Sequence, residues 1–203
     1  DVRMHEVFAD PTVPILTCWV QAADYAREHF ARATIDVGIA ISDTFFYDGT
    51  VKEDLLVAYM PRRGLATIKQ CLRAVRDVEF VAIDGLDEPG VASVLKRAGV
   101  FLATAAGEEF GLPALEALAA GCVVLSVPVK GGMEYLHHGV NSLVISPDEM
   151  PSTLAAVTRQ DERTRRSVFR SRAIATAFRY RRTRQRRHLV DLVRTESWHK
   201  AVA

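Results

Sequence analysis

Short apolar runs alternate with amphipathic segments through the middle of the chain. The apolar runs, which are typical of strands buried on both faces of a parallel sheet, cover residues 55–59, 78–83, 100–103 and 123–127. Segments with apolar residues at helical spacing lie between them, at residues 65–75, 91–97 and 113–120. This alternation predicts an α/β fold with a doubly wound, Rossmann-like parallel sheet.

The two ends of the chain break the alternation. Residues 13–20 have the composition of a strand and residues 21–30 that of an amphipathic helix, whereas residues 35–49 lack a sustained period and indicate a partly packed linker. Beyond residue 160, apolar residues recur at spacings that suit helices with one apolar face. We therefore expect three segments: residues 1–50, a central domain of residues 51–160, and extra C-terminal helices in residues 161–203.

Composition argues against a membrane-spanning or secreted protein. The longest apolar stretches, residues 98–106 and 122–129, are much shorter than the ~20 residues that cross a bilayer, and no cleavable leader is recognisable. Cys18, Cys71 and Cys122 are widely separated in apolar surroundings, which indicates buried thiols in a reducing compartment. We therefore expect a cytoplasmic protein.

Four loops that follow predicted strands contain residues suited to ligand binding. They are residues 61–64, 84–87, 105–113 and 130–134. Ligands of open parallel sheets bind beyond the carboxyl ends of the strands, and these loops lie at that edge. The binding site is therefore expected among them.

The segment GEEFGLPALEALAAG, residues 107–121, combines helix-start signals with a close-approach glycine. Pro113 suits the first helical position, and Gly121 suits a left-handed cap at the other end. The helix start directs free N–H groups and partial positive charge into the loop, and Gly111 leaves room for a phosphate beside the backbone. The segment therefore predicts an anion site.

Two carboxylates flank this predicted anion site. Glu108 precedes the helix and Glu116 lies one turn inside it, eight residues later. A diphosphate alone would repel both, whereas carboxylates can accept hydrogen bonds from hydroxyl groups, as an acidic residue does for a ribose in dinucleotide-binding folds. A ligand with a diphosphate between two polyols satisfies both features, so we predict a nucleotide sugar.

The same segment resembles the E-x7-E motif of group 1 (family 4-like) glycosyltransferases, with Glu109 where that family usually has glycine. Three further stretches are similar to the family, especially to its bacterial capsule and exopolysaccharide members: AYMPRR at residues 58–63, KGGME at residues 130–134, and HGVNSLV at residues 138–144. The resemblance spans about residues 55–147. It implies the C-terminal, nucleotide-sugar-binding domain of the two-domain GT-B fold.

The resemblance also implies roles for individual residues. Glu108 would lie near the donor sugar and Glu116 would hold the ribose hydroxyls, while Arg62 would contact the leaving diphosphate. Arg63 would substitute for a lysine that family members usually place about five residues after this arginine, where this chain has Thr67. The remaining donor-site contacts expected from the resemblance are Gly111, Leu112, Gly85 near the nucleobase, Gly131, Gly132 and Glu134.

The implied reaction is transfer of a sugar from a nucleoside diphosphate to an acceptor hydroxyl, with retention of anomeric configuration. The chain has no Asp-x-Asp pair and no convincing histidine ligand spacing, so we expect neither a metal nor a cofactor beyond the donor substrate. The acceptor is expected to be a saccharide or a lipid-linked saccharide, in polysaccharide or glycoconjugate synthesis.

GT-B enzymes have two Rossmann-like domains, and residues 1–50 are expected to supply only a strand, a helix and a linker of the first. The rest of that domain is expected from a longer chain or from a partner chain. The C-terminal helices, which resemble the terminal helices of the family over residues 171–193, would cross back toward it.

Two alternatives to a transferase follow from the sequence. The first is a regulatory module that binds nucleotide sugars without turnover. The second rests on the twelve arginines between Arg159 and Arg187, which could form a nucleic-acid-binding surface. Interspersed apolar and acidic residues favour helices instead, so we expect no nucleic acid, although a basic face could contact the inner surface of a membrane.

Overall fold

The structure is a computed structural model, and it describes residues 2–195 of the 203. Residue 1 and residues 196–203, which belong to the predicted segments 1–50 and 161–203, lie outside the described residues. The described residues form two compact units, one of residues 41–179 and the other of residues 2–40 with residues 180–195. No helix among the described residues is long and apolar enough to cross a bilayer.

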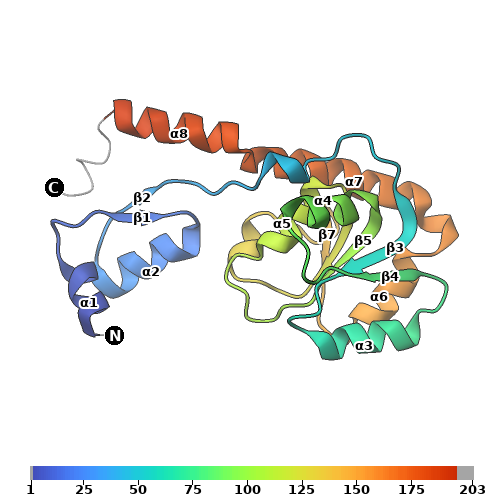
Figure 1. Ribbon diagram of the computed structural model, residues 1–203. Helices are drawn as coiled ribbons and strands as arrows, with labels where there is room; N and C mark the ends of the chain where they lie inside the picture. Colours follow the sequence, from blue (N-terminus) through green and yellow to red (C-terminus); the bar gives the residue numbers. More distant parts are fainter. Residues whose placement is uncertain (1, 196–203) are drawn as a thin grey trace. The chain divides into compact units, whose positions relative to one another are not determined.

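The larger unit contains a five-stranded parallel sheet in the order β4-β3-β5-β6-β7 (Figure 1). Its strands are β3 (Glu53–Tyr59), β4 (Glu79–Ala82), β5 (Ala98–Ala103), β6 (Val123–Ser126) and β7 (Ser142–Val144). The chain moves outward from β3 to β4 and then returns past β3 to β5, so the direction of winding reverses between the two central strands. This order confirms the predicted doubly wound, Rossmann-like sheet.

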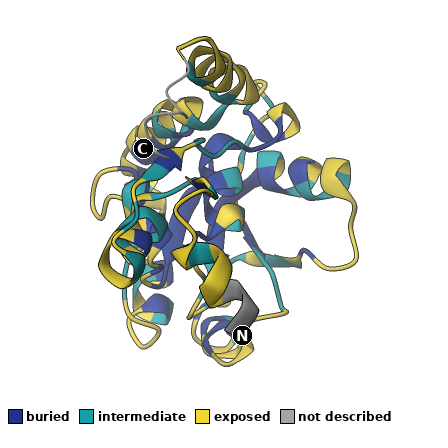
Figure 2. Cartoon of the chain, turned by 90° about the vertical axis from the view of Figure 1, so that its left-hand side faces the viewer, coloured by how far each residue is buried: buried dark blue, intermediate teal, exposed yellow. Residues whose placement is uncertain are grey.

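Helices cover both faces of this sheet. Helices α3 (Leu65–Ala74) and α6 (Met150–Val157) pack together on one face, whereas α4 (Glu88–Arg97), α5 (Leu112–Ala119) and α7 (Arg163–Ala177) lie on the other (Figure 1). Short 3-10 helices complete this unit at η1 (Asp43–Phe45), η2 (Gly131–Glu134) and η3 (Gln160–Glu162). A fourth, η4 (Phe178–Tyr180), ends at the first residue of the smaller unit's C-terminal segment. Burial is concentrated along the strands, as the dark blue ribbon in Figure 2 shows.

Several predicted boundaries need correction. The strand predicted over residues 13–20 is only β1 (Ile15–Thr17), and the predicted linker of residues 35–49 begins inside a second short strand, β2 (Thr34–Asp36). Strand β7 and helix α1 (Val2–Ala9) were not expected. Pro113 is the second rather than the first residue of α5. Elements of three residues are too short to produce a recognisable period, which explains most of these differences.

The smaller unit is built on a two-stranded parallel pairing. β1 pairs with β2 from Ile15 opposite Thr34 to Thr17 opposite Asp36, and helix α2 (Val20–Phe30) connects them. Helix α8 (Arg182–Arg194) joins this unit, because Gln185 Nε2 donates to the carbonyl of Gly38 at 2.8 Å.

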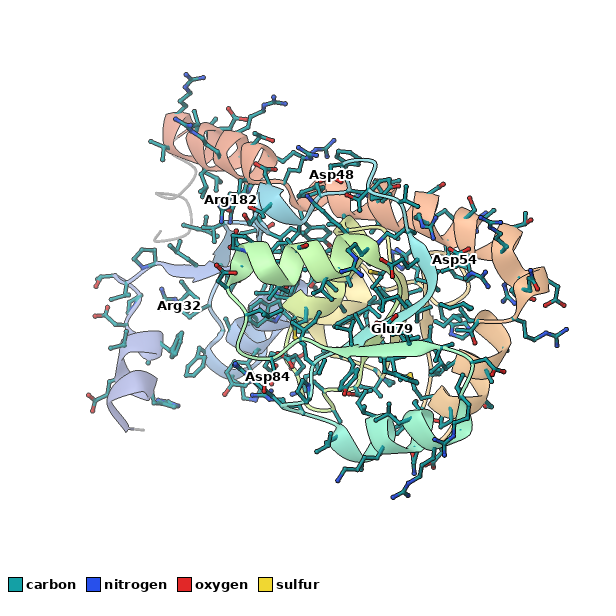
Figure 3. All side chains as sticks on the ribbon, turned by 45° about the vertical axis from the view of Figure 1, so that its right-hand side comes forward. Arg32, Asp48, Asp54, Glu79, Asp84 and Arg182 are labelled. Carbon is teal, nitrogen blue, oxygen red and sulfur yellow. The ribbon has the colours of Figure 1, made fainter. Side chains whose placement is uncertain are left out.

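Part of the arginine-rich tail has a structural role in the larger unit. Asp54, at the start of β3, accepts contacts from Arg163, Arg166 and Arg170 of α7 at 3.2–3.4 Å. The Arg166 side chain is only 4% exposed and also donates to two backbone carbonyls. Figure 3 shows Asp54 and Asp84 at opposite ends of the strands, Asp54 where β3 begins and Asp84 just after β4 ends. These arginines therefore bind α7 to the N-terminal end of β3, away from the predicted site at the carboxyl ends of the strands.

Candidate functional site

The predicted site lies where the winding of the sheet reverses. A cavity of about 310 Å³ opens between the ends of β3 and β5. Arg62, Arg63, Glu108 and Gly111 all line it, so four of the predicted residues are brought together. Its apolar wall includes Met60, Phe101, Leu102, Pro113, Ala114 and Val129. In doubly wound sheets this switch point is where ligands bind.

The β3 and β5 loops that form this cavity are held against each other. Gly64, which starts α3 in a left-handed conformation (φ 70°), lies so close to the next loop that an added Cβ would be 2.0 Å from the carbonyl oxygen of Thr104. The buried Thr104 hydroxyl donates to the carbonyl of Arg63 at 3.2 Å. Only glycine fits at position 64, and the contact fixes the backbone that carries both arginines.

Each of the two arginines is paired with a carboxylate from another loop. Arg62 Nε lies 3.3 Å from Asp84 Oδ1, and Arg63 Nη1 lies 3.6 Å from Glu108 Oε2. Both arginine side chains are more than 60% exposed. Exposed pairs of this kind contribute only about 0–1 kcal/mol, so an incoming phosphate can displace the carboxylates at little cost.

Helix α5 presents its N-terminus to the cavity. Gly111 precedes the helix in a left-handed conformation (φ 80°), and the N–H groups of Gly111 and Leu112 donate to no group among the described residues. Unpaired N–H groups and the helix dipole at such a position attract anions. Leu112 itself is exposed and does not line the cavity.

Glu116 lies one turn into α5, outside the cavity lining. Its side chain is partly buried and has no hydrogen-bond or ion-pair partner among residues 2–195. Burial raises its pKa from 4.5 to about 7, and the nearby charge of Glu88 at the start of α4 adds to the increase. A partly buried carboxylate without a donor is unusual, and perturbed groups of this kind concentrate at functional sites.

The glycine pair after β6 packs against the loop between β5 and α5. Gly131 and Gly132 are buried, and the Gly131 N–H donates to the carbonyl of Glu109 at 2.5 Å. An added Cβ at Gly131 would lie 2.8 Å from the Phe110 ring. The structure therefore gives this pair a packing role, and direct ligand contact by it stays a prediction.

The other predicted contacts surround the cavity without lining it. Glu134 is half-buried in η2, and Gly85 lies in the exposed loop after β4 with open space around its Cα. Their contact with a ligand stays a prediction. The sequence assigned no role to Gly64, Thr104 or Tyr135, because their roles arise from contacts with residues at least 24 positions away in sequence.

Comparison with known proteins identifies the family. The sequence profile described as "Glycosyl transferases group 1" matches residues 55–160, which is about half of the chain. The chain belongs to the group 1 glycosyltransferases. The predicted family membership is thus confirmed. A separate comparison with curated protein sequences gives no match.

Solved structures of this glycosyltransferase fold are similar to the chain. The Anabaena protein HepE is 14% identical with a TM-score of 0.71 and covers 90% of this chain and 64% of its own. Sucrose-phosphate synthase from Thermosynechococcus elongatus is 15% identical with a TM-score of 0.72, over 89% of this chain and 57% of its own. The chain thus spans less than two thirds of these two proteins.

A third neighbour is a single domain. The C-terminal domain of a group 1 glycosyltransferase from Francisella tularensis is 14% identical with a TM-score of 0.57, and the match covers 68% of this chain and 97% of that domain. This match agrees with the predicted GT-B C-terminal domain.

Proposed function

We propose that this glycosyltransferase chain is the nucleotide-sugar-binding portion of a retaining enzyme that transfers a sugar from a nucleoside diphosphate sugar to an acceptor hydroxyl. The observation that carries the proposal is one cavity that gathers Arg62, Arg63, Glu108 and the start of α5. Glu116, which has no hydrogen-bond or ion-pair partner within residues 2–195, lies one turn further along the helix. Cations and N–H groups suit a diphosphate, and the carboxylates suit the hydroxyls on either side of it.

Structural neighbours support this ligand class. HepE has been crystallised with UDP, with UDP and glucose, and with UDP-glucose. The pneumococcal O-GlcNAc transferase GtfA, 17% identical with a TM-score of 0.66, has been crystallised with UDP and GlcNAc. We propose a uridine nucleotide as the first donor to test.

In the proposed reaction the bond from the anomeric carbon to the diphosphate oxygen breaks, and a bond to the acceptor oxygen forms on the same face of the sugar. As the bond to the diphosphate breaks, negative charge develops on its oxygen, and this oxygen takes up the proton that the acceptor hydroxyl loses. Arg62, Arg63 and the N-terminus of α5 would stabilise that charge by electrostatics already in place. Glu108, at the cavity wall, would orient the sugar.

We propose that the transfer needs no metal or cofactor. Among residues 2–195, no group of three or more His, Cys, Asp and Glu side chains is placed to hold a metal ion. The acceptor is proposed to be a saccharide or lipid-linked saccharide of polysaccharide or glycoconjugate synthesis, used in the cytoplasm at the inner face of the membrane.

Calorimetry tests donor binding. UDP, GDP, ADP, TDP and UDP-glucose are titrated into the wild-type chain, Glu116→Ala and Glu109→Ala. Glu109 is the matched control, because it is an exposed neighbouring carboxylate that pairs with Lys130 at 3.6 Å. We expect micromolar to millimolar binding that weakens at least tenfold in Glu116→Ala and is unchanged in Glu109→Ala. Absence of binding at millimolar nucleotide, or equal binding by Glu116→Ala, would contradict the proposal.

A further inference from the structure

A buried tyrosine contacts the backbone on which the proposed phosphate site depends. Tyr135 follows the glycine pair and is completely buried. Its hydroxyl lies 3.0 Å from the carbonyl oxygen of Phe110 and 2.5 Å from that of Gly111, two consecutive carbonyls that its single hydrogen can reach. The Tyr135 and Phe110 rings also pack together, with centroids 5.4 Å apart.

The direction of these two carbonyls fixes the direction of two N–H groups. The Phe110 carbonyl and the Gly111 N–H belong to one planar trans peptide, so they point in opposite directions. The same holds for the Gly111 carbonyl and the Leu112 N–H. The Gly111 carbonyl also accepts from the Ala114 N–H of α5 at 3.0 Å, so Tyr135 and the helix together hold this carbonyl, whereas Tyr135 holds that of Phe110. With both carbonyls directed toward the Tyr135 hydroxyl, both N–H groups point away from it.

Gly111 lines the cavity, and neither of these N–H groups has a partner among the described residues. Gly111 is left-handed and Leu112 begins the right-handed helix α5. Successive residues of opposite handedness bring neighbouring N–H groups together into a concave anion-binding arrangement. An added Cβ at Gly111 would lie 3.0 Å from the Tyr135 oxygen, so the hydroxyl and the glycine fit closely.

The backbone of Tyr135 is held in place by Asn141. Asn141 Nδ2 donates to the Tyr135 carbonyl at 2.8 Å and to the Thr176 hydroxyl of α7 at 2.9 Å, while Asn141 Oδ1 accepts from the His137 N–H. Hydrogen bonds thus connect α7, through Asn141 and Tyr135, to the start of α5.

From these contacts we propose that Tyr135 is a positioning residue, whose hydroxyl orients the Gly111 and Leu112 N–H groups to bind the donor phosphates. This role rests on the proposed function, because it assigns the phosphate contact within the same site. It predicts that Tyr135 contributes to the binding of phosphate and not to that of the base or ribose.

The test is a titration of 15N-labelled chain with UDP and with uridine, followed by NMR and repeated for Tyr135→Phe. In the wild type, UDP should produce larger downfield shifts of the Gly111 and Leu112 amide protons than uridine does. In Tyr135→Phe the Kd for UDP should rise about tenfold, as expected for loss of one oriented hydrogen-bond donor. The Kd for uridine should change less than about twofold.

Tyr25→Phe is the matched control, because Tyr25 is exposed and lies in the smaller unit. The proposal is overturned if Tyr135→Phe binds UDP as the wild type does, or if its affinities for UDP and uridine fall in the same proportion. If Tyr135→Phe does not fold, the wild-type shifts decide, since unshifted Gly111 and Leu112 amides overturn the proposal. If no nucleotide of the calorimetric panel binds the wild type, the proposed function itself fails. If UDP binds the wild type but Tyr135→Phe has no selective effect on it, only the role of Tyr135 fails.

Discussion

The carboxyl group of Glu116 should make stability depend on pH in a direction opposite to that of most carboxylates. Its pKa is 4.5 in an unfolded chain and about 7 in the folded chain, because burial and Glu88 disfavour the charged form. The folded state therefore binds the proton more tightly. The stabilisation this provides is complete below pH 4.5 and is lost as pH rises through 7.

The magnitude follows from the pKa difference. One pKa unit corresponds to about 1.4 kcal/mol, so the raised pKa of Glu116 accounts for at most about 3 kcal/mol, since solvent reaches part of the side chain. Glu116→Gln has no charge to desolvate. Urea denaturation at pH 5 and at pH 8 should show the variant gaining up to this amount relative to the wild type at the higher pH. A difference between the two proteins that is the same at both pH values would refute the reasoning.

The same titration should appear in ligand binding. If ribose hydroxyls donate to ionised Glu116, the fraction of competent protein rises from about one tenth at pH 6 to about nine tenths at pH 8. UDP affinity should then rise about tenfold over this range in the wild type relative to Glu116→Gln. The variant corrects for titration of the UDP phosphate, whose own pKa lies near 6. Parallel pH profiles would contradict a ribose contact.

Three further substitutions test separate parts of the structure. Gly64→Ala should destabilise the chain by roughly 3 kcal/mol or more and abolish UDP binding, because its Cβ would overlap the Thr104 carbonyl; urea denaturation and calorimetry check both effects. Arg62→Ala should weaken UDP binding about tenfold and leave uridine binding unchanged, as measured by NMR titration, and an equal loss for both ligands would contradict a phosphate contact. Asp54→Ala should cost about 2 kcal/mol in urea denaturation, since it leaves the buried charge of Arg166 unpaired, without changing UDP affinity.

The sheet could be predicted where its strands are long enough to show a pattern. The apolar runs that became β3, β5 and β6 are continuous and mostly buried, and their order along the chain predicted the doubly wound fold. Strands β2 and β7 have three residues each, which is too few for a period to be recognised. They form because neighbouring strands offer them hydrogen-bonding partners, and that information is not local.

The site shows the same division between local and non-local information. Glu108 and Gly111 could be found because helix-start signals and carboxylates occur within one short segment. Gly64 and Tyr135 could not, because their roles arise from contacts with Thr104 and with Phe110 and Gly111, at least 24 residues away in sequence. Residues that hold a loop in place carry no motif of their own.

The most direct test of a donor site between β3 and β5 is a crystal structure of the chain with bound UDP. We expect the diphosphate beside Arg62 and the N–H groups of Gly111 and Leu112, with a ribose hydroxyl within hydrogen-bonding distance of Glu116. A nucleotide bound elsewhere, or an empty cavity at millimolar UDP, would contradict it.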